Sequence, residues 1–386
     1  FKAVSSHRTP KGSRMSDCNH WRRIGLLLIL ATLVQGWGIA RNTVPAQDAI
    51  NFIQFARQLD HHSLVDTLRS NTQHPLYPLL VWLNHRLLGG VLEADGIGWI
   101  RSAQFVAGLA AVLLVVPMYG AGVRLANPLL ATGATALFST LPFAARVGAD
   151  ALSDSTYLLF MMLGFWTATE FLVSHRARWL TATGLSIGLA YLARPEALFL
   201  PTALALTLIV VQWRRDWRMP WKRLGIGAAC GAAGLLLVVA PYALSVGKLT
   251  PKGSLNLLPG GRTLFAKFDS TQGRPQTRTL SDGQAVAAPA AKTPLIPAPG
   301  GTLDFARNHR PDHERLVGHM AAFRELVREL VEGMHYLLGL LVLVGVCFAD
   351  RRPANLLTSI LAMIFLIVLV QFASKSGYIA SRHVIT

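Results

Sequence analysis

Long apolar runs alternate with short polar segments along most of the chain. Nine of these runs are expected to form membrane helices: 24–40, 103–119, 129–145, 155–173, 180–193, 197–212, 224–244, 335–348 and 355–373. Several are shorter than the roughly 20 residues that a perpendicular crossing needs. The still shorter run 76–88 contains His85 and Arg86 and predicts an interfacial helix or a segment that dips into the membrane. The pattern predicts an all-α polytopic integral membrane protein.

The composition agrees with this class. Of the 386 residues, 52% are apolar and 15% are charged, whereas a soluble protein averages about 25% charged residues. The formal net charge of +17 would suggest nucleic-acid binding if the basic residues formed a stripe. They lie between the apolar runs instead, so we expect membrane lipids and no nucleic acid as partners.

The distribution of Lys and Arg orients the helices. With the N-terminus in the cytoplasm, the inner segments hold sixteen Lys and Arg against three acidic residues, over 1–23, 120–128, 174–179, 213–223 and 349–354. The longer outer loop 41–102 holds five basic and five acidic residues. Because Lys and Arg are retained on the cytoplasmic side, we expect a multi-pass protein of the cell (inner) membrane with the N-terminus inside.

This topology divides the chain into four regions. The basic N-terminus 1–23 is cytoplasmic, and Met15 is an alternative start that would leave 1–14 outside the native protein. The membrane domain is 24–244, and its first run also fits a signal peptide, although it is long for one. Region 245–334 is an extracytoplasmic loop with an Ala/Pro-rich linker and an amphipathic helix. Region 335–386 holds the last two spans and an outer C-terminal segment, with truncation after Thr386 as an alternative.

Polar clusters that the topology places on the outer face are the candidates for chemistry. They are Asp48; His74 and Tyr77; Asp150 and Asp154; Arg194 and Glu196; and Lys375, Tyr378, Arg382 and His383. A transporter places charged groups near the bilayer midplane. Charges at the outer rim favour an enzyme that acts on a lipid headgroup.

Each cluster also has a structural interpretation. Asp48 and Asp154 each precede a helical run and can serve as an N-cap. Arg194 and Glu196 flank a proline and can form a turn in which the arginine snorkels to the interface. The histidines have spacings that match no zinc ligand pattern, so no metal site is predicted. The cysteines form no CxxC pair and indicate neither a disulfide framework nor a metal site.

Five segments in order resemble the GT-C glycosyltransferases of the protein-mannosyltransferase and aminoarabinose-transferase type (glycosyltransferase family 39/83-like). They are the loop with Asp48, HPLYPLL at 74–80, LPFAARVGADALSDSTYLL at 141–159, GLAYLARPEAL at 188–198 and SGYIASRH at 376–383. The resemblance spans nearly the whole chain. It implies a GT-C-like helical bundle with interfacial helices and a large extracytoplasmic loop, in a cell-envelope enzyme that takes a sugar from a polyprenyl-phosphate carrier.

The resemblance also implies roles for individual residues. Asp48 and Asp154 would be the catalytic carboxylates. The substrate-binding candidates are His74, Tyr77, Arg194, Glu196, Tyr378, Arg382 and His383. The implied partners are a polyprenyl-phosphate-linked sugar donor and a lipid, protein or glycan acceptor, and a need for a divalent cation is left open.

The residue types suit this chemistry. A carboxylate can take the proton of an acceptor hydroxyl or amine as that group attacks the anomeric carbon. Arginine can stabilise the phosphate that leaves. A single displacement inverts the anomeric configuration and needs one base, unlike the paired carboxylates of retaining glycosidases. The alternatives are a transporter or flippase of lipid-linked sugars and an inactive truncated paralogue.

Overall fold

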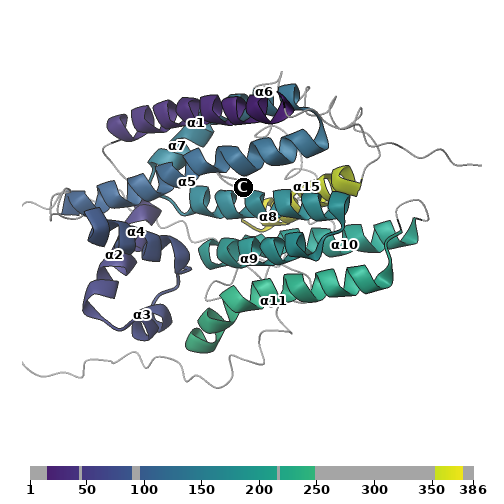
Figure 1. The fold of residues 1–386 in the computed structure, drawn as a ribbon. Coiled ribbons are helices and arrows are strands. Elements are labelled where there is room, and N and C mark those ends of the chain that lie inside the picture. The colour runs from purple at the N-terminus through teal and green to yellow at the C-terminus, as the bar shows by residue number, and fades with distance from the viewer. Residues whose placement is uncertain (1–14, 43–45, 89–95, 215–217, 248–352, 377–386) are drawn as a thin grey trace, which may run out of the picture.

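A computed structural model describes residues 15–42, 46–88, 96–214, 218–247 and 353–376. Within these ranges the chain forms helices and no strand. Six long helices lie side by side with their axes roughly aligned: α1 (Met15–Arg41), α5 (Gly96–Leu125), α8 (Asp154–Ser174), α9 (Ala177–Ala193), α10 (Phe199–Trp213) and α11 (Trp221–Val246) (Figure 1). The predicted all-α class is confirmed.

Five helical segments among the described residues are long and apolar enough to cross a membrane: Asn19–Arg41, Ile97–Leu125, Asp154–Ser174, Pro195–Trp213 and Trp221–Val246. The protein is a multi-pass membrane protein. Helix α9 covers the predicted run 180–193 but has only 17 residues. The predicted span 335–348 lies outside the described residues.

The predicted span 129–145 is not one continuous helix. It is divided into α6 (Pro128–Thr140) and α7 (Pro142–Ala149), with Leu141 between them in an extended conformation. Pro142 accounts for the division, because a proline disfavours the helical conformation for the residue before it and fits the first position of a new helix. The run therefore forms two short helices between α1, α5 and α8.

Three short helices gather at one end of the bundle, at the left of Figure 1: α2 (Gln47–His61), α3 (Leu64–Ser70) and α4 (Leu76–Leu88). The predicted run 76–88 is thus a helix, α4. An apolar cluster joins α2 and α4 to the start of α5, with Phe52, Tyr77 and Trp99 among its buried members.

Glycines allow α9 and α11 to approach closely. A Cβ atom on Gly184 would collide with the backbone carbonyl of Gly231, and one on Gly188 would lie 2.7 Å from Val238. Small residues at such contacts let membrane helices pack by van der Waals contact. The order of the contacts shows that the two helices run in the same direction, since later residues of α9 meet later residues of α11.

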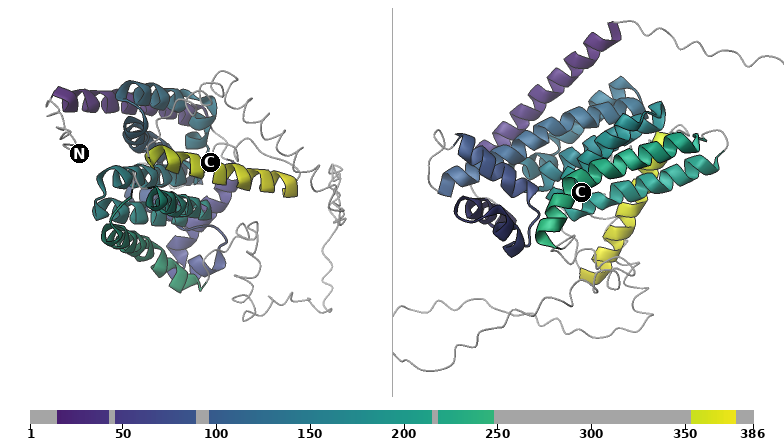
Figure 2. Two further views of the ribbon diagram at one scale, coloured as in Figure 1. Left: turned by 90° about the vertical axis from the view of Figure 1, so that its right-hand side faces the viewer. Right: turned by 60° about the horizontal axis from the view of Figure 1, so that its bottom comes forward.

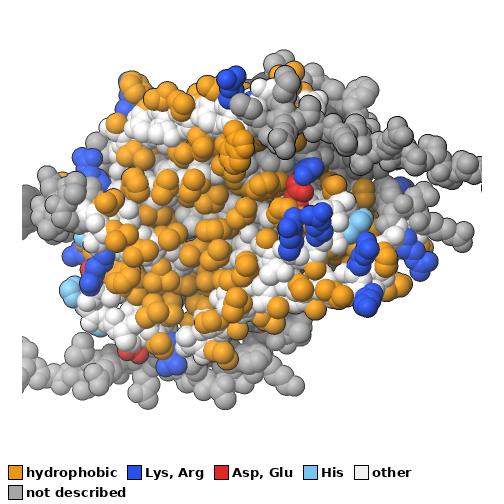
Figure 3. Space-filling view, in the orientation of Figure 1, with side chains coloured by type: hydrophobic (Ala, Val, Ile, Leu, Met, Phe, Trp, Pro, Cys, Tyr) orange, Lys and Arg blue, Asp and Glu red, His pale blue; other side chains and the backbone are white. Residues whose placement is uncertain are grey.

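The last described helix, α15 (Pro353–Ser376), packs against α10 and α8, as the two views of Figure 2 show in yellow. Phe199 and Phe365 meet edge to face, with ring centroids 5.3 Å apart. Figure 3 shows a broad hydrophobic surface across the middle of the bundle, with Lys and Arg side chains towards its two ends. This banding is what a lipid-embedded bundle requires.

Candidate functional site

The described candidates lie at the end of the bundle where α2, α3 and α4 gather. Helix α8 begins there, and α9, which runs antiparallel to it, ends there. Ala49, next to Asp48, belongs to the same apolar cluster as Ala151 and Leu152, which precede Asp154. Residues more than a hundred positions apart in the sequence are therefore held at one end of the fold.

An ion pair forms the centre of this group. Arg194 Nη2 lies 2.7 Å from Asp154 Oδ2, and Arg194 Nε lies 3.4 Å from Ser153 Oγ. The Asp154 side chain is only 4% exposed, whereas that of Arg194 is 27% exposed. The pair thus connects a buried carboxylate to a guanidinium that remains partly accessible.

The interpretation of Asp154 as an N-cap is wrong, and that of Arg194 is correct only for the turn. Ser153 occupies the N-cap position of α8, without a side-chain cap hydrogen bond, and Asp154 is the first residue of the helix. Arg194 does form the predicted turn, because it ends α9 before the short 3-10 helix η1 (Pro195–Leu198). Its guanidinium, however, binds Asp154 instead of extending to an interface.

The turn before α8 is strained. Ala151 has φ 56° and is fully buried, in a region of backbone conformation that residues with a Cβ adopt rarely. Asp150, beside it, accepts a hydrogen bond of 2.6 Å from Asn42 Nδ2. Burial raises the pKa of Asp150, and the Asn42 hydrogen bond and Arg146 only partly oppose this shift. The polar contact fixes the end of α1 beside this turn.

Tyr157 and Glu196 add two buried polar atoms to the site. Tyr157 is fully buried and its hydroxyl has no hydrogen-bond partner, and Glu196 Oε2 is buried without one as well. Glu196, Arg194 and Asp154 all act electrostatically on the Tyr157 hydroxyl. Tyr157 was not among the sequence candidates. Its spacing of three residues after Asp154, which places both on one helix face, was the available signal.

His74 and Tyr77 join α4 to the bundle. His74 is 2% exposed and packs between Tyr191 of α9 and Tyr242 of α11, with ring centroids 5.4 Å and 6.0 Å away. Tyr77 is fully buried and donates a hydrogen bond of 2.9 Å to the Ala103 carbonyl. Burial raises the pKa of Tyr77 well above its usual value, and the charge of Asp154 adds to the shift. In this structure Tyr77 is a packing residue close to Asp154.

Asp48 lies in the first turn of α2 and is half-buried. The interpretation of Asp48 as an N-cap is wrong, because Ala46 occupies that position and no side chain caps the helix. A carboxylate in a first turn still interacts favourably with the helix dipole. Any carboxylate in a first turn makes this interaction, so the interaction does not exclude a chemical role for Asp48.

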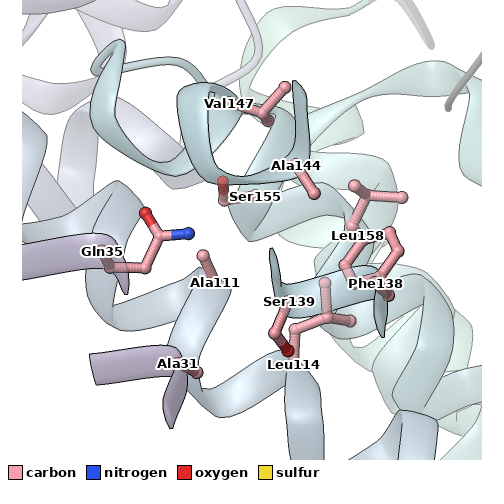
Figure 4. Close-up of a pocket in the computed structure, with 10 residues that line it drawn as sticks. All are labelled: Ala31, Gln35, Ala111, Leu114, Phe138, Ser139, Ala144, Val147, Ser155 and Leu158. Atoms are coloured by element: carbon pink, nitrogen blue, oxygen red, sulfur yellow. The ribbon is translucent and has the colours of Figure 1, made fainter. Parts of the chain in front are cut away.

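A small cavity lies behind the α7–α8 turn, between α1, α5, α6 and α8 (Figure 4). Its walls are apolar except for Gln35, Ser139 and Ser155. Gln35 is 6% exposed, and its Oε1 is buried without a partner. No charged side chain lines this cavity, so it does not offer the cation that a phosphate-bearing donor would require.

The remaining charged groups are distributed differently. Glu170 near the other end of α8 pairs with Arg124 of α5. Within the part of the chain that the structure describes, no three His, Cys, Asp or Glu side chains are grouped as metal ligands would be. Tyr378, Arg382 and His383 lie outside the described residues, so their predicted roles stay predictions.

Residues 73–243 match the family model described as dolichyl-phosphate-mannose-protein mannosyltransferase. The resemblance to the GT-C glycosyltransferases is confirmed over this segment. The segment contains Asp154, Tyr157, Arg194 and Glu196, whereas Asp48 precedes it. The ion pair of the site therefore lies within the segment that matches this family model.

The solved structures that are similar to the chain include two archaeal oligosaccharyltransferases. No curated protein sequence matches the chain. One is the archaeal oligosaccharyltransferase AglB from Archaeoglobus fulgidus in complex with an inhibitory peptide and a dolichol-phosphate, at 15% identity and a TM-score of 0.47, covering 66% of this chain and 33% of that one. The other is the apo oligosaccharyltransferase of the same organism, at 13% identity and a TM-score of 0.49, covering 92% and 50%. The chain thus spans at most half the length of these structures.

Proposed function

We propose that the protein is an inverting glycosyltransferase that moves a sugar from a polyprenyl-phosphate carrier to an acceptor on the extracytoplasmic face of the membrane. The observation that carries the proposal is the buried Asp154–Arg194 pair, within the segment that matches the mannosyltransferase family model. The charges lie near the ends of α8, with Glu170 paired near the opposite end, and this arrangement favours rim chemistry over midplane transport.

The proposed reaction is a single displacement. The acceptor oxygen or nitrogen forms a bond to the anomeric carbon, and its proton passes to the Asp48 carboxylate. The bond between that carbon and the phosphate oxygen breaks, and the electron pair leaves with the lipid phosphate. Among the described residues, Arg194 can stabilise this phosphate. Its guanidinium is 27% exposed, and one of its nitrogens is held by Asp154.

In this proposal Asp154 positions Arg194. A guanidinium that is already oriented by a buried carboxylate loses less freedom when it binds an anion. His383 and Arg382 remain proposed contacts of the donor phosphate, and Tyr378, His74 and Glu196 proposed contacts of the substrate. The acceptor is a lipid, a protein or a glycan.

Asp48→Asn tests the role of the general base. Asparagine preserves the shape of the side chain and removes its basicity, and Asp48 is not the N-cap of α2. We expect a folded protein with unchanged donor KM and a kcat lowered on the order of 10²–10⁴. The assay is transfer from a labelled polyprenyl-phosphate sugar in nanodiscs, beside thermal unfolding.

Asp60→Asn is the matched control. Asp60 lies on the same helix, and its carboxylate pairs with Arg86 at 2.9 Å, away from the Asp154 pair. This variant should retain kcat, because it alters only the contacts of Asp60 with Arg86 and Trp82 near the surface. Wild-type turnover in a folded Asp48→Asn protein would remove Asp48 from the mechanism and make Asp154 the next candidate base.

A further inference from the structure

The end of the bundle opposite the candidate site carries a group of exposed cations. We call it the basic end and define it by five exposed side chains: Arg176, Arg178, Arg218, Lys222 and Arg223. None of them takes part in the three ion pairs found among the described residues. Figure 3 shows Lys and Arg side chains over the right-hand end, where α9 and α11 begin in Figure 1.

The packing of α9 on α11 places these cations at one level. Leu180 contacts the positions of both Gly227 and Gly231, and the two helices run in the same direction. One turn earlier, Arg176 therefore lies level with the stretch that starts at Arg223. Arg223 also acts on His175, whose pKa is lowered by burial and further by the positive charge of Arg223. Positive charges that lie at one level of the bundle repel one another.

The helix ends add to this unbalanced positive charge. The first turns of α9 and α11 contain no acidic residue, and their N-caps, Arg176 and Pro220, make no side-chain cap hydrogen bond. Arg178, Lys222 and Arg223 occupy those first turns instead. Cations are unfavourable at a helix N-terminus, where the macrodipole is positive. An external anion would relieve both the dipole and the mutual repulsion.

The surroundings identify the anion as part of a lipid. Trp213 is 85% exposed and Trp221 is 65% exposed, at the junction of α10 and α11. Exposed tryptophans of this kind sit at the headgroup level of a bilayer. Ile226, one turn further into α11, is 49% exposed and continues the apolar surface. The cations thus stand at the level of the lipid phosphates.

We propose that the basic end binds the headgroups of anionic phospholipids in the leaflet that surrounds the starts of α9 and α11. The exposed arginines suit phosphate because the guanidinium presents paired donors. The negative surface of such a leaflet favours each nearby Lys or Arg by about fivefold in binding. The group is a lipid site distinct from the candidate site, which lies at the other end of the same helices.

The test measures which lipids the full chain retains. The protein is placed in nanodiscs that contain phosphatidylcholine and phosphatidylglycerol, extracted into mild detergent, and examined by native mass spectrometry for bound lipid. The wild type should retain phosphatidylglycerol preferentially. The double variant Arg176→Gln/Arg223→Gln should lose this preference on the order of tenfold.

The matched control is Arg57→Gln/Arg101→Gln, which removes two exposed arginines from the other end. It should keep the wild-type preference. Raising the salt concentration, which screens exposed charges, should lower the preference of the unaltered protein and so tests the claim without any substitution. Equal retention of the two lipids by the wild type, an equal loss in both double variants, or a preference insensitive to salt would each overturn the proposal.

Discussion

The Asp154–Arg194 pair predicts an asymmetry between the two partners. Arg194→Gln leaves a carboxylate that is 4% exposed without its cation, whereas Asp154→Asn leaves a guanidinium that is 27% exposed and can reach water. Removal of one partner of a buried ion pair destabilises a protein by about 3–5 kcal/mol. Because Arg194 is partly exposed, we expect the lower end, about 3 kcal/mol, for Arg194→Gln.

Asp154→Asn should destabilise the protein far less. The amide oxygen of asparagine can still accept the 2.7 Å hydrogen bond from Arg194 Nη2. Because the acceptor is then neutral, the hydrogen bond is weaker, and we expect a loss of about 1 kcal/mol in the free energy of unfolding. The double variant should be close to Asp154→Asn alone, since no charge is then left buried. The three free energies of unfolding and the wild-type value form a double-mutant cycle.

The measurement is reversible unfolding of the purified protein in detergent micelles. Arg86→Gln is the exposed control, because Arg86 is 59% exposed in its pair with Asp60, and should cost about 0–1 kcal/mol. The reasoning would be refuted if Arg194→Gln destabilised the protein no more than Asp154→Asn, or no more than Arg86→Gln. In either case the carboxylate would not depend on its arginine.

Three further predictions concern individual side chains. Tyr157→Phe removes a hydroxyl without a partner and should change the unfolding free energy by no more than about 0.5 kcal/mol, whereas Tyr77→Phe removes the hydrogen bond to the Ala103 carbonyl and should cost about 1–3 kcal/mol. An equal loss in both variants would contradict the different hydrogen bonding of the two hydroxyls. Gly184→Ala should destabilise by about 1–3 kcal/mol because its Cβ meets the backbone of α11, while Gly133→Ala, with open space around it, should not; thermal unfolding compares them. The pKa of Asp150 is higher in the folded than in the unfolded protein, so protonation of Asp150 favours the folded state. This contribution to the free energy of unfolding is fully present below about pH 4 and is lost as the pH rises through the folded pKa. Asp150→Asn should therefore make stability less dependent on pH in that window, and an unchanged pH profile would disprove the shift.

The long apolar runs were sufficient to predict the bundle and the approximate positions of its long helices, but they gave no indication of the short helix α3. They did not predict the division at Leu141–Pro142, although the proline was visible, because the apolar run continues through it. Helix start assignments also failed at Asp48 and Asp154. An earlier residue occupies the N-cap position in both cases, Ala46 in α2 and Ser153 in α8, and a first-turn carboxylate has the same local sequence signal as a cap.

The site could be predicted in its location but not in its contacts. Because consecutive membrane helices run in opposite directions, the start of α8 and the end of α9 lie on one side of the bundle. Asp154 and Arg194 were therefore expected on the same face. Their direct pairing depends on the register between two helices, which no local pattern specifies. Tyr157 was missed because an aromatic residue in an apolar span is usually a packing residue, and only its hydroxyl without a partner distinguishes it.

The proposed function is tested most directly by the stereochemistry of the transferred sugar. The full chain in nanodiscs would be given polyprenyl-phosphate mannose, the sugar in the description of the matching family model, and then the glucosyl and aminoarabinosyl donors. A serine- and threonine-containing peptide and a membrane-lipid extract would serve as acceptors. Nuclear magnetic resonance would read the anomeric configuration of the product. We predict release of polyprenyl phosphate and a product of inverted configuration; a retained configuration, or no release from any of the donors, would contradict the proposal.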